Sequence, residues 1–182
     1  EVGVAAGMAS LGKKNDLINA GMIEVDATGH SAAGVGMAAL GFRNDVVNVG
    51  DLEVEVAAHQ LAAALGMGAY GDHNRVVNVG EIEVAAEGDQ ISVALGLGAH
   101  GFGNRVINDG YLDVSANAVD VGVAVGTVTI GKKNVVVNTS GKDEAGVVHV
   151  EASGNMAAAI GMGVVGDRSA LVNEGDAWAL AS

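Results

Sequence analysis

Carboxylates recur through the chain at a nearly constant interval. Successive members of the main series lie 29, 30 and 30 residues apart, at Glu24, Glu53, Glu83 and Asp113. If equivalent positions stack, these groups lie ~5 Å apart and repel by about 1 kcal/mol per pair in water. Such a column is a candidate for weak Ca²⁺ binding, because Ca²⁺ takes oxygen ligands. The alternative is a solvated face that keeps the protein soluble and blocks unwanted sheet contacts.

Two series of asparagines follow the same interval. The first contains Asn15, Asn44, Asn74, Asn104 and Asn134, and the second contains Asn19, Asn48, Asn78, Asn108, Asn138 and Asn173. At a turn, an Asn side chain can bond nearby backbone groups, and stacked amides can bond one another. We therefore interpret both series as structural columns and assign them no ligand.

The residues that could support catalysis are scattered. The histidines occupy different positions of the repeat, so we expect no ligand cluster among them: His30, His59, His73, His100 and His149. The Gly-x-Gly patterns, such as residues 66–68, recur inside expected strands and open no helix, which excludes a dinucleotide loop. Polysaccharide lyases and hydrolases also use β-helices, but place cations and aromatic residues with acids in a cleft. We therefore expect no enzyme and, beyond weak Ca²⁺, no cofactor.

A repeated unit of about 30 residues must position these columns. Its anchor glycines are offset by 29, 30, 30, 30 and 35 residues, at Gly7, Gly36, Gly66, Gly96, Gly126 and Gly161. The copies span approximately 1–30, 31–60, 61–90, 91–120, 121–155 and 156–182, with a corner loop inserted near 139–145. A period of this size indicates a solenoid, in which each unit buries its apolar face against its neighbours.

Each copy alternates with period 2 in three short segments. In the third copy these are residues 63–70, 74–78 and 82–84. Alternation bounded by Gly and Asn predicts strands joined by turns. We therefore predict an all-β fold, a right-handed parallel β-helix of about six coils in a single domain, 1–182. The glycine after the second Asn, such as Gly50 or Gly80, is expected at a corner that requires positive φ.

The composition excludes several classes of protein. The 182 residues include 29 Gly, no Pro and no Cys, and 49% are apolar. Glycine without Pro or a G-X-Y period excludes collagen, and the apolar share argues against disorder. The net charge of −13 argues against nucleic acid and anionic membrane surfaces as partners. Apolar runs are too short for membrane insertion. The chain opens at Glu1 without Met, which suggests a processed product or a fragment.

The small residues of the first segment predict a contact surface. Medium-sized side chains such as Leu65 and Met67 are expected on one face of this strand, and the anchor glycines on the other. A flat face of this kind is suited to close packing against a partner. The alternative is a surface that merely tolerates small residues. Neither end shows a cap, so the rod either continues in a longer chain or stacks on another copy, which can generate fibres.

Two stretches carry a resemblance to known proteins. Residues 48–54 (NVGDLEV) and 78–84 (NVGEIEV) resemble the N-x-G-x-I-x-V repeats of autotransporter passengers and related bacterial adhesins. The resemblance implies a right-handed parallel β-helix displayed at the surface of Gram-negative cells, with a role in adhesion, aggregation or a fibrous stalk. A competing resemblance lies in residues 92–96 (SVALG), which are similar to the heads of trimeric autotransporters. Those heads are left-handed rolls with half this period.

These observations predict a secreted structural or adhesive subunit at the cell surface or in a biofilm. We expect it to self-associate into filaments or matrix fibres. The alternative is a monomeric adhesin that binds a cell-surface or matrix ligand. An ice-binding solenoid is disfavoured because its regular threonine array is missing: the chain has only Thr28, Thr127, Thr129 and Thr139.

Overall fold

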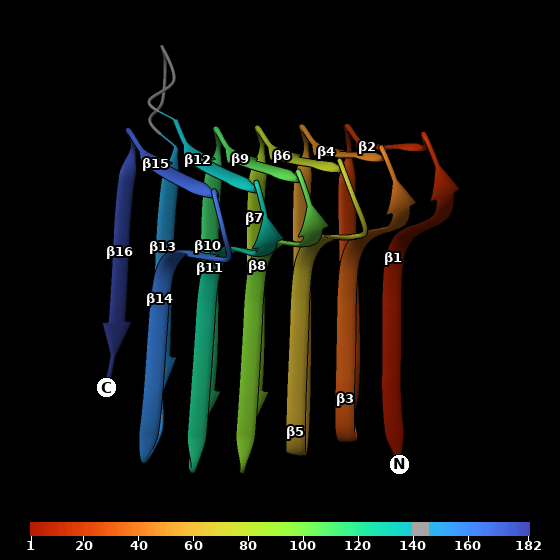
Figure 1. Cartoon of the computed structure of the whole chain (residues 1–182). Coiled ribbons are helices and arrows are strands. Elements are labelled where there is room, and N and C mark those ends of the chain that lie inside the picture. The colour runs from red at the N-terminus through yellow and green to blue at the C-terminus, as the bar shows by residue number, and fades with distance from the viewer. Residues whose placement is uncertain (140–145) are drawn as a thin grey trace.

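The computed structural model describes residues 1–139 and 146–182, and these residues form strands and turns without a helix. Sixteen strands wind about one axis into a rod (Figure 1). In Figure 1 the chain ascends along the near strands, crosses the top and descends behind as it advances toward the C-terminus, which is a right-handed course. The prediction of a parallel β-solenoid with about six coils is confirmed.

Each coil contributes one strand segment to each of three faces. The long sheet contains β1 (Val2–Lys13), the second halves of β3 (Met22–Phe42) and β5 (Asp51–Tyr70), then β8 (Ile91–Phe102), β11 (Val121–Lys132) and β14 (Met156–Val165). The short sheet contains β2 (Asp16–Asn19), β4 (Asp45–Asn48), β6 (Arg75–Asn78), β9 (Arg105–Asn108), β12 (Val135–Asn138) and β15 (Ala170–Asn173). The acidic sheet contains the first halves of β3 and β5, then β7 (Glu81–Gly88), β10 (Tyr111–Ala118), β13 (Val147–Ser153) and β16 (Asp176–Ala181).

Neighbouring strands pair in parallel with equivalent residues opposite one another. Asn48 pairs with Asn78, and Asn78 pairs with Asn108. Since parallel strands lie ~4.8 Å apart, one residue type forms a column along the rod. The inserted loop predicted near 139–145 falls largely outside the described residues, which resume at Gly146.

The core is thin because large side chains of one sheet meet small ones of the other. The inward residues of the acidic sheet include Leu52 and Val54, which are buried. They face inward alanines of the long sheet such as Ala62 and Ala64. This pairing of large and small side chains lets two sheets pack closely with few aromatic residues.

The anchor glycines face this core, so the prediction that they form an outer association face is wrong. A methyl group at Gly66 would lie 2.7 Å from the Gly96 carbonyl oxygen and 2.9 Å from Val84 Cγ2. The equivalent glycines have their closest side-chain neighbours in the acidic sheet in every coil: Gly7, Gly36, Gly66, Gly96, Gly126 and Gly161. In the first five, those neighbours come within 3 Å, so glycine is required for the two sheets to approach.

The alternation of the long sheet breaks at the anchor glycine. Gly66 and the following Met67 are both buried, whereas Leu65 is only half-buried on the outer side. The prediction that Leu65 and Met67 share a face is therefore wrong, because the strand shifts by one position at the glycine. The medium-sized side chains are divided between the core and the outer surface.

A second group of glycines is also explained by close approach. Gly50 and Gly80 do not adopt positive φ, contrary to the sequence prediction. A methyl group at Gly80 would lie 2.1 Å from the Gly50 carbonyl oxygen of the coil before it. Stacking of the coils, and not the turn conformation, therefore selects glycine at this corner.

Candidate functional site

The second asparagine column forms a buried hydrogen-bonded ladder. The Asn48 side-chain amide donates to Asn78 Oδ1 at 3.0 Å, and Asn78 donates to Asn108 Oδ1 at the same distance. Each amide also donates to a backbone carbonyl of the next coil, as Asn78 does to Tyr111 at 3.0 Å. The same side-chain contact links Asn19 to Asn48, Asn108 to Asn138, and Asn138 to Asn173. The predicted structural role is consistent with this geometry.

The first asparagine column joins the coils through the backbone. The Asn74 backbone N–H donates to Asn104 Oδ1 at 2.7 Å, while the Asn74 side-chain amide donates to the Gly41 carbonyl at 3.1 Å. Each residue therefore connects both neighbouring coils, and Ser169 takes the last position by accepting from the Asn134 N–H at 3.1 Å. The internal residues Asn44, Asn74, Asn104 and Asn134 are buried, and each uses its side-chain nitrogen and its side-chain oxygen in hydrogen bonds to neighbouring coils, which fits a structural role.

The predicted carboxylate column exists on the outer surface of the acidic sheet. Glu24, Glu53, Glu83 and Asp113 are paired in register through successive coils. They do not converge: the described part of the chain contains no group of three or more His, Asp or Glu residues able to hold a metal ion. Loss of hydration, followed by the charges of Glu53 and Asp26, raises the pKa of the adjacent Glu55 above its ordinary value.

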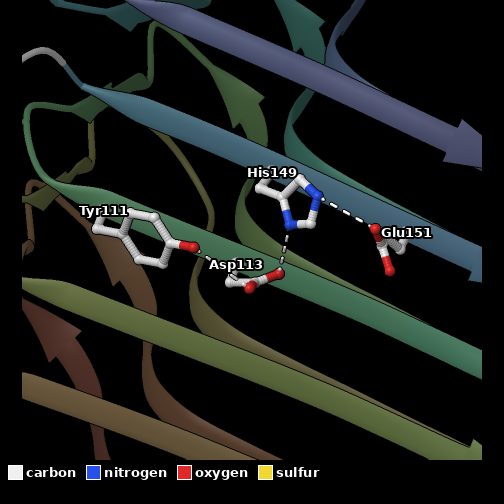
Figure 2. A network of polar contacts seen from close by, with 4 residues as sticks. All are labelled: Tyr111, Asp113, His149 and Glu151. Carbon is white, nitrogen blue, oxygen red and sulfur yellow. Dashed lines mark hydrogen bonds and ion pairs between the residues drawn. The ribbon is translucent and has the colours of Figure 1, made fainter.

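One histidine enters the acidic sheet and joins two carboxylates. His149 Nδ1 lies 3.1 Å from Asp113 Oδ1, and its Nε2 lies 3.3 Å from Glu151 Oε1 (Figure 2). The Tyr111 hydroxyl donates to Asp113 Oδ2 at 3.4 Å. Burial and then the charge of Asp113 raise the pKa of Tyr111. The cluster ties β10 to β13, and both ring nitrogens of His149 are used in doing so.

A groove of mixed polarity, the corner groove, follows the corner between the acidic and long sheets. It has a volume of about 960 Å³ and is lined by residues of successive coils, including Thr28, His30, His59, Glu87 and Asp89. The rings of His30 and His59 lie 6.3 Å apart, and His59 Nδ1 lies 2.9 Å from Asp89 Oδ2. These two histidines occupy equivalent positions of the repeat, which corrects the prediction that all five positions differ.

The outer surface of the long sheet is predominantly apolar. Its five outward columns pass through Leu61, Ala63, Leu65, Gly68 and Tyr70 of the third coil. These columns contain no Asp, Glu, Lys or Arg in any coil, and their only polar side chains are Ser31, Tyr70 and His100. Several large members are exposed: Leu61 is 42%, Val93 37% and Ile130 45% exposed. The alternation of the strand breaks at the anchor glycine, so the sequence pattern alone does not show which residues of this strand face outward.

A shallow apolar groove crosses this surface along the rod axis. Gly68 and Gly98 lie at its floor. Leu65 and Leu95 line one side, and Tyr70 and its equivalents in the neighbouring coils line the other. The groove has a volume of about 350 Å³. The rings of Tyr70 and His100 stack at 4.8 Å along its wall. Ridges and a groove therefore alternate on one uncharged face, which suits contact with another apolar surface.

Among the residues that the structure describes, no helix long and apolar enough to cross a membrane is present. Comparison with known proteins gave no match: no family of related sequences, no curated protein and no solved structure is detectably similar to this chain.

Proposed function

We propose that this protein is an extracellular structural or adhesive β-solenoid subunit that self-associates into filaments or matrix fibres. The observation that carries the proposal is the uncharged outer surface of the long sheet. On a chain with a net charge of −13, an apolar sheet free of charged residues across six coils is an unusual surface to leave in water. Burial against a second copy removes it from solvent.

The dimensions of this surface are adequate for a stable contact. Six coils at ~4.8 Å give about 29 Å along the axis, and ten residues of strand give about 33 Å across it. The resulting area, roughly 950 Å² per copy, matches the approximately 800 Å² per partner of standard protein interfaces. Two copies facing each other through this sheet therefore have enough area to associate without any further contact.

Extracellular placement rests on the repeat type. The stretches at 48–54 and 78–84 resemble the repeats of autotransporter passengers and bacterial adhesins. A rod with stacked Asn ladders and a parallel sheet on every side is also suited to bearing load, because each coil is hydrogen-bonded to its neighbours. Weak Ca²⁺ binding along the column containing Glu53 and Glu83 remains part of the proposal.

The second candidate function is a monomeric adhesin. The corner groove favours it, because this groove follows the rod axis and its lining includes hydroxyl, imidazole and carboxylate groups, among them Thr28, His59 and Asp89. These groups can hydrogen-bond an extended hydroxyl-rich ligand such as a glycan chain. In this case the apolar sheet has no partner and the protein stays monomeric at high concentration.

Sedimentation velocity from about 1 to 100 μM, with and without Ca²⁺, separates the two candidates. In 500 mM NaCl, we expect wild-type oligomers that dissociate in the Val93→Lys variant, because this substitution places a charge near the centre of the apolar surface. Val79→Lys is the matched control, since Val79 is 47% exposed but lies at a corner outside that surface. A wild-type monomer at every concentration would refute the proposal and favour the adhesin.

A further inference from the structure

The basic residues of the chain gather along one corner of the rod. We define the basic corner as residues 13–16 and their equivalents in the other coils, between the long and short sheets. Eight of the nine Lys and Arg residues lie there: Lys13, Lys14, Arg43, Arg75, Arg105, Lys132, Lys133 and Arg168. Four carboxylates accompany them (Asp16, Asp45, Asp72 and Asp167), which leaves a local charge of +4 on a chain whose net charge is −13.

The backbone at this corner does not favour these long cations. Lys14, Arg43, Lys133 and Arg168 have φ between 55 and 57°. In this left-handed region, glycine is the least strained residue and Asn is tolerated. The fourth coil uses glycine here, since Gly103 has φ 66°. Folding alone therefore does not require Lys or Arg at the corner, and their charge is the property left to explain.

Aromatic rings hold two of these cations in place. The Arg43 guanidinium lies 4.8 Å from the Phe42 ring centre, and Lys133 Nζ lies 5.2 Å from that of Phe102. The His73 ring packs between the two phenylalanines, 5.3 Å from each. Cation–π contacts restrict these side chains, so the cations lose less entropy on meeting an anionic partner.

The acidic sheet presents the complementary charge. Its outward positions carry eleven carboxylates and neither Lys nor Arg: Glu24, Asp26, Asp51, Glu53, Glu55, Glu81, Glu83, Glu87, Asp113, Glu151 and Asp176. Each coil carries at least one cation at the basic corner and at least one outward carboxylate on the acidic sheet. Both series therefore advance by the same ~4.8 Å along the axis.

We propose that the basic corner of one copy docks along the acidic sheet of a second copy, with the two rod axes aligned. Because the two charge series have the same spacing along the axis, cations of one copy meet carboxylates of the other on successive coils. Two identical rods have this matching spacing automatically. The contact joins two different surfaces, so it does not close and can extend sideways into sheets of rods. The inference rests on the proposed self-association for its partner, but it uses surfaces distinct from the apolar one.

Three sets of substitutions test this contact in the full chain. The corner set is Lys14→Asn, Arg43→Asn, Lys133→Asn and Arg168→Asn, which removes the charges while Asn still accepts the left-handed backbone. The face set is Glu24→Gln, Glu53→Gln, Glu83→Gln and Asp113→Asn. A matched control neutralises four carboxylates elsewhere: Glu1→Gln, Asp89→Asn, Asp120→Asn and Glu174→Gln. Circular dichroism verifies that each variant retains its β structure.

Assembly is measured by light scattering and negative-stain microscopy between 20 and 500 mM NaCl. We expect the wild type and the control to form extended assemblies at 20 mM NaCl. At 500 mM NaCl, assembly should require a protein concentration about tenfold higher or more, because salt screens the contact. The corner set is expected to stop at small oligomers at every salt concentration. Equal low-salt assembly by the wild type and the corner set would overturn the proposal.

Charge exchange and the apolar variant separate the two modes of association. One chain carries Lys14→Asp, Arg43→Asp, Lys133→Asp and Arg168→Asp, and a second carries Glu24→Lys, Glu53→Lys, Glu83→Lys and Asp113→Lys. These two chains are expected to form extended assemblies only when mixed, and failure of the mixture would overturn the proposal. Val93→Lys removes apolar pairing but is expected to keep salt-sensitive assembly, so loss of either contact is seen independently. Binding of heparin to the corner without self-assembly would indicate a polyanion as the partner and refute this one.

Discussion

Removal of one internal rung of the Asn ladder should destabilise the solenoid more than removal of its last rung. Asn78 is fully buried, accepts a hydrogen bond from Asn48, and donates to Asn108 Oδ1 and to the Tyr111 carbonyl, all at 3.0 Å. Asn78→Ala removes these three bonds and leaves buried partners unsatisfied. At about 1 kcal/mol for each bond, with more for an orphaned group, we expect a loss of roughly 3 kcal/mol in unfolding free energy.

Asn173→Ala is the matched variant in the last coil. Asn173 is exposed and accepts one side-chain bond, from Asn138 at 2.9 Å. After the substitution, Asn138 still donates to the Gly146 and Asp176 carbonyls. We therefore expect a loss below about 1 kcal/mol, because water can replace the missing acceptor.

Urea unfolding followed by circular dichroism measures both free energies. Trp178 fluorescence supplies a second probe, located in the last coil, and coincident transitions would support a two-state treatment. If the wild type associates, measurements use the Val93→Lys background in 500 mM NaCl, so that neither mode of association contributes. Equal losses for Asn78→Ala and Asn173→Ala would refute the view that ladder position and burial determine the effect.

Three further predictions test the core and the acidic sheet. Gly66→Ala should lower the free energy of unfolding, measured by chemical denaturation, by about 2 kcal/mol or more, because the new methyl group would lie 2.7 Å from the Gly96 carbonyl oxygen. Gly21→Ala should change this free energy little, because a methyl group at Gly21 would face open space. Thr127→Val should raise the melting temperature, because the Thr127 hydroxyl is buried without a hydrogen-bond partner among the described residues and removing it restores about 1 kcal/mol. Glu55→Gln should stabilise the protein at pH 7 by roughly a few tenths of a kcal/mol. The reason is that the raised pKa of Glu55 means that ionisation of this carboxyl opposes folding. A melting-temperature series should show this advantage fading as pH falls through the raised folded-state pKa of Glu55. It should be lost below the ordinary value of 4.5, where the carboxyl is protonated in the folded and unfolded chain alike. An advantage that grows at low pH would contradict the assignment.

The sequence by itself determined the repeat and the elements that follow from it. The interval between equivalent residues, such as Asn48 and Asn78, and the period-2 alternation were enough to predict parallel strands stacked in register. The carboxylate column of Glu53 and Glu83 was predictable for the same reason, since a strand with alternate apolar residues must turn the others toward solvent. These features depend on local periodicity, which is present in a single chain.

Only the tertiary structure decided which face of the long sheet is outside. Alternation predicts that Leu65 and Met67 lie on the same side, but the strand shifts at Gly66, so Leu65 faces outward and Met67 enters the core. At this position the long sheet approaches the acidic sheet so closely that a methyl group on Gly66 would lie 2.9 Å from Val84 Cγ2. The sequence shows that the anchor glycine recurs, but not that the alternation breaks there, because the break is a property of packing between strands that are distant in the sequence.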